Sequence, residues 1–368
     1  MDNPVKIIFG DGTIERLNRE IPSTLKNILL VTGRHVAESG LLEQLNSILA
    51  NRTVTVHCGV AAEPPLHEVE NIIETGRRSG AQAVVAVGGG SVIDAAKAAA
   101  ALIPVSGNLK QYFDGTLSIS GKGLFMAALP TTAGTGAELT PNAVLTDPET
   151  QIKKSLRHQT MYPDLAIIDP ELLAGCSYEL AVNSGLDAFT QAVESYISLG
   201  ANQASREHAA LAAGLLYRNL PIFAADRSNA VARRAMAEGS MNGALAFAVS
   251  GLGAVHGIGH PIGSLLKVSH GRCCAILLPP VLRWNLPVSE KYYAELAEIC
   301  GLPSDAEGFV DAVGKLCTAL GIPGGFTSYG LAPKHFNFIV KNCRSNSMRN
   351  NPRPMSDNDV ISMLEELL

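Results

Sequence analysis

Residues 83–102 read AVVAVGGGSVIDAAKAAAAL: an apolar run, three glycines and a helical pattern. A short apolar run without polar alternation is typical of a strand that is buried on both faces of a sheet. The glycines and Ser91 join this strand to a helix predicted over residues 92–102. Glycines let a backbone approach a phosphate closely, and a helix amino terminus favours an anion. The segment therefore predicts a phosphate-binding strand–loop–helix unit, although a tight turn without a ligand would use the same residue types.

Similar apolar runs alternate with helical patterns around this unit. A helix with one apolar face is predicted at residues 67–79. Strands are predicted at residues 27–32, 53–56, 83–87, 124–129 and 165–168. Buried strands separated by helices are typical of a parallel sheet that is covered on both faces. The first half of the chain is therefore predicted to be a doubly wound, Rossmann-like α/β domain.

The pattern changes after about Cys176. Long Ala- and Leu-rich helical patterns follow, for example at residues 205–217 and 230–247, and strand signals become rare. We predict a dinucleotide-binding α/β domain at residues 1–177 and an all-α metal- and substrate-binding domain at residues 178–368.

The composition of the 368 residues excludes several classes of protein. Hydrophobic residues make up 46% and the net charge is −5, which argues against a disordered chain, a nucleic-acid binder or a protein held to a membrane by charge. No apolar run reaches the roughly 18 residues of a membrane span, and we see no signal peptide. The 7 cysteines are odd in number and form no CxxC pair, which favours free thiols in the cytoplasm.

A second glycine-containing loop, PTTAGTG, occupies residues 130–136 after the next predicted strand. Its hydroxyls at Thr131, Thr132 and Thr135 are suited to hydrogen bonds with a nucleotide. Alternatively, the threonines cap a helix that begins near Glu138. Two such loops at the carboxyl ends of neighbouring strands predict a ligand-binding crevice.

Histidines and carboxylates form a second candidate site. His256 and His260 are four residues apart and share a face if they lie on a helix, and His270 follows near a glycine. Asp187, Gln191 and Glu194 share a face in an earlier helical pattern. Imidazoles with a carboxylate favour Zn²⁺ or Fe²⁺, although a histidine pair of this spacing also occurs for purely structural reasons.

A series of motifs runs through almost the whole chain. These are FGDG at 9–12, GGGSVID at 88–94, PTTAGTG at 130–136, DAFT at 187–190, HGIGHPIG at 256–263, HG at 270–271 and NPRP at 351–354. In this order they resemble the iron-containing, or metal-dependent group III, alcohol dehydrogenases. The resemblance implies a Rossmann-like N-terminal domain, an all-helical C-terminal domain, as in dehydroquinate synthase, and a cleft between them.

The resemblance also implies roles for particular residues. The implied cofactor-binding residues are Gly88, Gly89, Gly90, Ser91, Asp94, Thr131, Thr132, Thr135 and Lys153. An aspartate and three histidines hold the metal in this family, and the matching positions here are Asp187, Gln191, His256 and His270. His260 matches the catalytic histidine that lies beside the nicotinamide and relays a proton.

The chain departs from the family pattern at three positions. Gln191 replaces a liganding histidine, which lowers the expected metal affinity, although an aspartate and two histidines make a sufficient catalytic site. Gly33 stands where NAD-using relatives carry an aspartate. With Arg34 beside it, this favours NADP(H) over NAD(H). Glu63 replaces the family's asparagine near the adenosine ribose.

The predicted activity is a reversible hydride transfer between NAD(P)(H) and a small alcohol, aldehyde or ketone, aided by Fe²⁺ or Zn²⁺. The resemblance also implies a homodimer. A metal-independent reductase of the maleylacetate-reductase type, and a degenerate cofactor-binding protein without turnover, are the alternatives that Gln191 leaves open. A dehydroquinate-synthase-like lyase is disfavoured, because no dense set of Lys and Arg surrounds the histidine motif.

Overall fold

The segment Ala83–Gly88 forms strand β4 inside a six-stranded parallel sheet of this computed structural model, which describes residues 3–150 and 152–368. The strand order is β1-β8-β5-β4-β2-β3. The strands are β1 (Lys6–Phe9), β2 (Asn27–Thr32), β3 (Thr53–Cys58), β4, β5 (Phe125–Pro130) and β8 (Leu165–Ile168). The chain passes from β2 to the edge strand β3 and returns to β4 on the other side of β2. The topology therefore reverses between β2 and β4, where open α/β sheets bind ligands.

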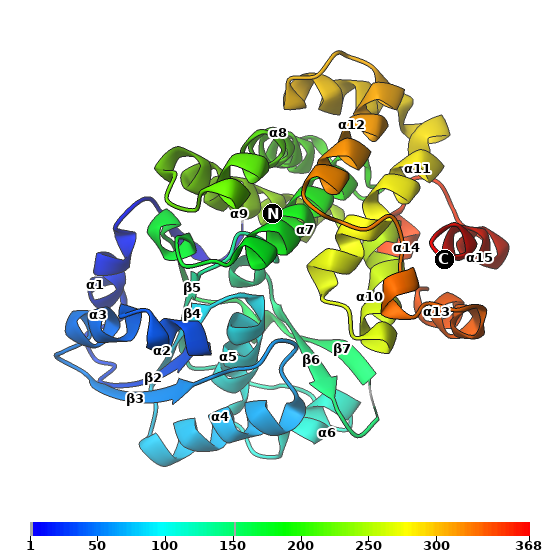
Figure 1. Cartoon of the computed structure of the whole chain (residues 1–368). Helices are drawn as coiled ribbons and strands as arrows, with labels where there is room; N and C mark the ends of the chain where they lie inside the picture. The colour runs from blue at the N-terminus through cyan, green and yellow to red at the C-terminus, as the bar shows by residue number, and fades with distance from the viewer. Residues whose placement is uncertain (1–2, 151) are drawn as a thin grey trace. The chain divides into compact units, whose positions relative to one another are not determined.

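Both faces of the sheet are covered by helices (Figure 1). The helices are α1 (Leu17–Glu20), α2 (Arg34–Glu38), α3 (Leu41–Ile48), α4 (Leu66–Ser79), α5 (Gly90–Leu102) and α6 (Leu109–Asp114). Leu29 and Val31 of β2 face a core shared with α4, α5 and α6, whereas Ile28 and Leu30 face a core with α1, α2 and α3. This two-sided burial explains why the strand sequences are apolar without alternation.

A hairpin of β6 (Asn142–Asp147) and β7 (Ile152–Arg157) lies outside this sheet and is antiparallel. Neither strand was predicted from the sequence. The helix suggested near Glu138 was wrong, because only a 3₁₀ turn forms at Ala137–Leu139. Thr140 precedes a proline and adopts an extended conformation, which stops the turn from continuing as a helix.

By contacts, the chain divides into two compact units. One contains residues up to Thr132 together with 136–176, and the other contains residues 133–135 together with 177–368. The described residues of the second unit from Ser177 onward contain helices and no strands. Its α-helices are α7 (Tyr178–Ile197), α8 (Gln203–Ala225), α9 (Ala230–Ser250), α10 (Ala254–Leu266), α11 (His270–Cys300), α12 (Ala306–Ala319), α13 (Phe336–Asn342), α14 (Asn346–Asn350) and α15 (Asp357–Glu366).

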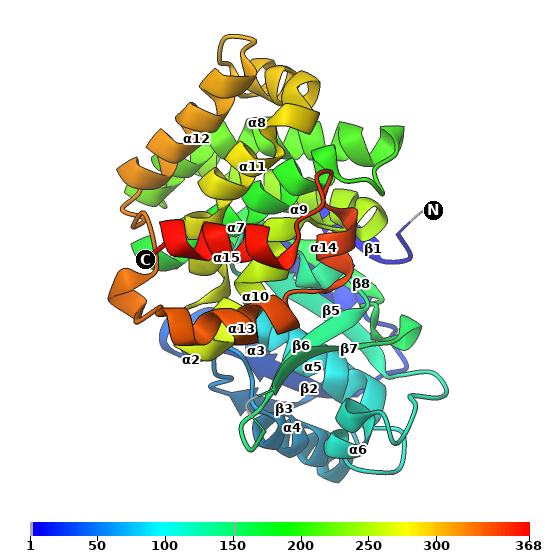
Figure 2. The ribbon, with the colours of Figure 1, turned by 90° about the vertical axis from the view of Figure 1, so that its right-hand side faces the viewer.

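Within this helical unit, α7, α8 and α9 pack together, and α11 packs on α7, α10 and α12. Figure 2 shows α13 beside α15, in agreement with their contacts. Ser177 caps α7 by accepting a hydrogen bond from the Leu180 N–H. Among the described residues, no single helix is both long and apolar enough to cross a membrane. Helices α9 and α10 would be long and apolar enough only if taken together, and they are bent by 103° relative to each other.

The predicted fold class, a Rossmann-like α/β part followed by an all-α part, is confirmed. The predicted strands at 27–32, 53–56, 83–87, 124–129 and 165–168 correspond to β2, β3, β4, β5 and β8. The predicted helices at 205–217 and 230–247 correspond to α8 and α9, which extend beyond them.

Candidate active site

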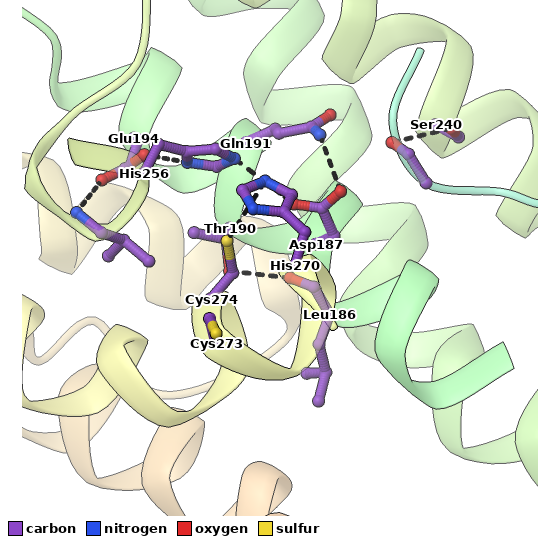
Figure 3. A network of polar contacts seen from close by, with 12 residues as sticks. Leu186, Asp187, Thr190, Gln191, Glu194, Ser240, His256, His270, Cys273 and Cys274 are labelled. Carbon is purple, nitrogen blue, oxygen red and sulfur yellow. Dashed lines mark hydrogen bonds and ion pairs between the residues drawn. The ribbon is translucent and has the colours of Figure 1, made fainter. Parts of the chain in front are cut away.

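Three helices of the helical unit bring the histidines and carboxylates together (Figure 3). Helix α7 carries Asp187, Gln191 and Glu194, whose spacing places them on one face. Helix α10 carries His256 and His260, and α11 begins with His270. The predicted i, i+4 histidine pair therefore lies on a helix, and residues far apart in sequence converge.

The centre of the site is a cluster of four possible metal ligands: Asp187, His256, His270 and Cys274, whose ligand atoms lie within 4.8 Å of one another. Asp187 Oδ1 is 3.3 Å from His256 Nε2 and 3.7 Å from His270 Nε2. Asp187 and His256 are each 2% exposed, yet neither Asp187 Oδ1 nor His256 Nε2 has a hydrogen-bond partner among the described residues. Buried polar atoms are normally satisfied, so these two atoms are suited to act as ligands of a cation.

Glu194 fixes the orientation of His256. His256 Nδ1 donates to Glu194 Oε2 at 2.6 Å, and the Val255 N–H donates to Glu194 Oε1 at 2.7 Å. While Nδ1 carries the proton of this bond, Nε2, which lies 3.3 Å from Asp187 Oδ1, can bind a cation through its lone pair. A carboxylate behind a histidine is the usual support of a metal ligand. Gly253 is needed here, since a Cβ at this position would lie 2.7 Å from Glu194 Oε1.

The NPRP motif also contacts the start of α10, the helix that carries His256. Asn351 Oδ1 accepts a hydrogen bond from the Ala254 N–H at 3.1 Å, and Asn351 exchanges hydrogen bonds with Asn285 of α11. Arg353 stacks on Trp284 with 3.8 Å to the ring centroid. The motif thus anchors the first turn of α10, which carries His256.

Gln191, a predicted metal ligand, contacts the cluster through its amide nitrogen. Gln191 Nε2 donates to Asp187 Oδ2 at 3.2 Å, and Figure 3 shows the amide oxygen turned away from this carboxylate. The bond leaves Asp187 Oδ1 directed at the histidines.

His260, the predicted proton relay, is exposed and lies beside the cluster. Its ring stacks on that of His270, with 4.8 Å between the centroids and 9° between the planes. The ring is therefore close to the candidate ligands, but it is not one of the clustered groups.

The charges of the cluster favour a bound cation. Burial alone would raise the pKa of the Asp187 carboxyl, but the charges and hydrogen bonds of the neighbouring His270, His256 and Cys274 together outweigh it, and the pKa is lowered. Burial also opposes a charge on His256, yet its interactions with Cys274, Glu194 and Asp187 raise its pKa well above the usual value. Burial raises the pKa of the Cys274 thiol to about 12. Positive charge is thus stabilised here, and the donor set suits a divalent metal.

Sequence reasoning missed Cys274 altogether and missed the role of Glu194. Cys274 follows His270 by one helical turn, and that i, i+4 spacing was the available signal. Glu194 was placed on the correct face of α7, but its bond to His256 could not be inferred from spacing.

Most of the predicted cofactor residues lie in the N-terminal unit, at the carboxyl ends of β2, β4 and β5. The Thr131 N–H donates to the Gly88 carbonyl at 3.0 Å, so the two glycine loops lie side by side. A Cβ at Gly88 would lie 2.5 Å from Val92 Cγ2, so only glycine fits there. No side chain caps α5, whose first turn therefore keeps N–H groups for an anion. These features fit a nucleotide phosphate.

Lys153 and Glu63 form an ion pair beside this loop. Lys153 Nζ is 2.6 Å from Glu63 Oε1, and the Glu63 N–H donates to Ser91 Oγ at 3.1 Å. Glu63 has a φ of 55°, a value that non-glycine residues rarely adopt. The carboxylate that replaces the family's asparagine is thus bound to the predicted cofactor lysine.

Two other predicted cofactor residues have different surroundings. Asp94 is buried, accepts from the Val144 N–H at 2.9 Å and pairs with Lys97 at 3.0 Å, so it joins α5 to β6. Thr135 belongs by its contacts to the helical unit. In that unit the neighbouring Gly134 carbonyl accepts from Ser240 Oγ at 3.4 Å.

A glycine-loop α/β unit and a buried His–carboxylate cluster in one chain are the features expected of an enzyme that uses a nucleotide and a metal. Residues 4–170 match the family model of iron-containing alcohol dehydrogenases, and residues 181–368 match that of the C-terminal part of the Fe-containing alcohol dehydrogenase family. The chain therefore belongs to the iron-containing alcohol dehydrogenase family.

Named relatives resemble the chain over almost its full length. The NAD-dependent methanol dehydrogenase of Bacillus methanolicus is 28% identical over 99% of this chain and 98% of its own. Long-chain-alcohol dehydrogenase 1 of Geobacillus thermodenitrificans is 31% identical over 97% of this chain and 93% of its own. The structure of sulfoacetaldehyde reductase from Bifidobacterium kashiwanohense in complex with NAD⁺ matches with a TM-score of 0.94 and 29% identity, covering 100% of this chain and 97% of that one.

The protein is thus an oxidoreductase that interconverts an alcohol and a carbonyl compound by hydride transfer with a nicotinamide cofactor, and its family implies a metal, iron.

Proposed function

We propose that Asp187, His256 and His270 hold a divalent metal ion at which a small aldehyde or ketone is reduced. Two buried atoms support this assignment most directly, because Asp187 Oδ1 and His256 Nε2 face each other at 3.3 Å without a hydrogen bond. Such an arrangement is costly unless a proton on His256 Nε2 or a metal ion lies between the two atoms, and the raised pKa of His256 reflects the same demand for positive charge. A bound dication would act as a Lewis acid that stabilises the developing alkoxide.

The chain's own residues have three tasks in this proposal. Glu194 keeps His256 in the Nδ1–H tautomer. Gly88, Gly89, Gly90 and Ser91 receive the cofactor phosphates, with Thr131, Thr132 and Lys153 beside them. His260, stacked on His270, delivers a proton to the alkoxide oxygen.

The substrate class that we propose is a primary alcohol and its aldehyde. Methanol is a primary alcohol, and sulfoacetaldehyde is an aldehyde, so the names of two relatives indicate this class. The metal and the cofactor act only on the carbonyl carbon and oxygen, so they do not determine the rest of the substrate.

The cofactor preference that we propose is NADP(H) over NAD(H). After β2, Gly33 supplies no carboxylate to bond the ribose 2′-hydroxyl or repel a 2′-phosphate, and Arg34 is exposed beside it. Glu63 is paired with Lys153, which offsets its charge. Two relatives are named with NAD, so this chain would differ from them.

Gly33→Asp is expected to lower kcat/KM for NADPH by about 10- to 100-fold, because an interaction between the new carboxylate and the 2′-phosphate is worth about 1.5–3 kcal/mol. The kcat/KM for NADH should fall less, since NADH has no 2′-phosphate. A Cβ at Gly33 makes only an ordinary contact, 3.5 Å from Val92 Cγ2, so the side chain fits. Steady-state kinetics with both cofactors measure the ratio of kcat/KM for NADPH to kcat/KM for NADH. Gly33→Asn, with the same size and no charge, is the control, and an equal effect of both variants would contradict the charge argument.

Glu194→Gln is expected to weaken metal binding by about 10- to 100-fold, which is the usual effect of replacing a residue that hydrogen-bonds to a metal ligand. The glutamine amide has only one acceptor oxygen, whereas Glu194 accepts from both the Val255 N–H and His256 Nδ1. Competition with a chelating dye measures the affinity, and circular dichroism checks the fold. Glu179→Gln, at an exposed position of the same helix, is the control. Unchanged metal affinity in Glu194→Gln would refute the orienting role.

Turnover tests the proposed function as a whole. A panel of aldehydes is assayed with NADPH and NADH, after chelation and after return of Fe²⁺ or Zn²⁺. We expect reduction that stops on chelation and recovers with metal. Full turnover without metal would instead establish the metal-independent reductase, and cofactor binding without turnover under every condition would establish a degenerate binding protein.

We also propose a cytoplasmic homodimer. None of the seven cysteines, all of which are described, forms a disulfide, which suits a reducing compartment. The homodimer follows from the family resemblance, and sedimentation of the purified protein tests it.

A further inference from the structure

The thiol of Cys274 lies among the proposed metal ligands. Its Sγ is 3.6 Å from His270 Nε2 and within 4.8 Å of the ligand atoms of Asp187 and His256. Cys274 is fully buried and follows His270 by one turn of α11, so both side chains leave the same face of the helix. We propose that Cys274, rather than Gln191, is the fourth protein ligand, and that the site consequently prefers Zn²⁺ to Fe²⁺. This inference rests on the metal-dependent function proposed above.

The distances between the ligand atoms fit a single ion. Zinc bonds of 2.0 to 2.3 Å to O, N and S ligands give a tetrahedron with edges of about 3.3 to 3.8 Å. Asp187 Oδ1 lies 3.3 Å from His256 Nε2 and 3.7 Å from His270 Nε2, and Cys274 Sγ lies 3.6 Å from His270 Nε2. These three separations match the edges of such a tetrahedron, and the others are at most 4.8 Å, so the four side chains would have to close slightly around a zinc ion.

Gln191 is poorly arranged to compete for the same position. Its Nε2 donates to Asp187 Oδ2, and only its oxygen could bind a metal, because an amide N–H₂ has no free lone pair. That oxygen is buried without a hydrogen-bond partner among the described residues, as Asp187 Oδ1 and His256 Nε2 are, but it is turned away from Asp187 (Figure 3). Binding through it would cost the hydrogen bond that directs Asp187 Oδ1 into the cluster. Gln191 is thus a positioning residue for Asp187.

The chemistry of the donor set determines the metal. A thiolate is a soft ligand that favours zinc, and a Cys–His–carboxylate set is typical of zinc rather than of a mononuclear ferrous centre. Zinc can extend its coordination from four to five ligands, which leaves a position for the substrate. Within a family named for iron, this chain would therefore be a zinc member.

The neighbouring Cys273 provides a matched control. It is equally buried, but its Sγ donates to the Val268 carbonyl at 3.7 Å, and it lies against Gly259 and Gly263 of α10. Figure 3 shows its sulfur directed away from the cluster, in contrast to that of Cys274. A serine at either position has nearly the same size, so the pair separates ligation from packing.

The experiment begins with the unmodified protein loaded with one equivalent of metal. We expect X-ray absorption spectra of the zinc form to show one sulfur scatterer at about 2.3 Å beside nitrogen and oxygen at about 2.0–2.2 Å. We expect the cobalt form to show a thiolate-to-cobalt charge-transfer band in the near ultraviolet. Both readouts are independent of activity and need no variant to fold.

The variants then assign the sulfur. Cys274→Ser is expected to lose the charge-transfer band and the sulfur scatterer. It should also bind Zn²⁺ about 100-fold more weakly, since even residues that only hydrogen-bond to a metal ligand contribute 10- to 100-fold to metal affinity. Its loss of Fe²⁺ affinity should be smaller, so the preference for zinc shrinks. Cys273→Ser should keep both spectra and both affinities.

Two outcomes would overturn the inference, and they differ in what else they overturn. Stoichiometric metal bound only by nitrogen and oxygen would exclude Cys274 as a ligand and leave the proposed metal-dependent function intact. The absence of any stoichiometric binding of Zn²⁺, Fe²⁺ or Co²⁺ would refute the inference together with the proposed metal site.

Discussion

Asp187→Asn is expected to leave the protein folded, to strip it of metal and to lower kcat/KM by about a thousandfold or more. Asp187 is the only carboxylate in the cluster of described ligand groups, and it is buried between two imidazoles. Asparagine removes the anionic ligand and has nearly the same volume as aspartate. The effect of the substitution therefore comes from the lost charge and not from a cavity. Lewis-acid activation supplies several kcal/mol of transition-state stabilisation, and each 1.36 kcal/mol is tenfold in rate.

Metal content by elemental analysis and steady-state kinetics measure this result together. Asp311→Asn, on an exposed aspartate of α12, is the control and should change neither quantity. If Asp187→Asn lost its metal and kept the rate of the unmodified protein, the reduction would not need a metal. A metal-independent reductase would then be the correct interpretation.

His260→Ala is expected to lower kcat by about 10²- to 10⁴-fold, the usual contribution of a positioned proton donor. Cofactor affinity should fall far less, because His260 belongs to the helical unit and not to the glycine loops. The ring is exposed and stacked on His270, so its removal leaves no buried cavity. The large loss is therefore expected in the chemical step alone.

Cofactor binding followed by fluorescence, and turnover followed by absorbance, separate the two effects. Added imidazole should restore part of the activity of His260→Ala, and metal content should stay unchanged. His67→Ala, at an exposed histidine of α4, serves as the control. Equal losses in kcat and in cofactor affinity would discredit the proton-relay role.

The fold could be predicted where one local rule dominates. The apolar run before Gly88 has no polar alternation, and it proved to be a strand covered on both faces. Strand β1 was missed because it is four residues long and starts with a lysine. The hairpin was missed because β7 carries two adjacent lysines, Lys153 and Lys154, which are typical of a solvated surface.

The site could be predicted only in part. Spacing placed His256 and His260 on one helix face, but only the family resemblance separated His260 from the ligands. Periodicity along one helix does not determine which residues of another helix it meets. This is why the Glu194–His256 bond and the entry of Cys274 into the cluster became visible only in three dimensions.

Anomalous X-ray diffraction from crystals of the active enzyme, recorded on both sides of the zinc and iron absorption edges, tests the metal site most directly. The prediction is one anomalous peak at about 2.0–2.3 Å from Asp187 Oδ1, His256 Nε2 and His270 Nε2. No peak between these three atoms in crystals of fully active protein would contradict the metal site on which the proposed chemistry depends.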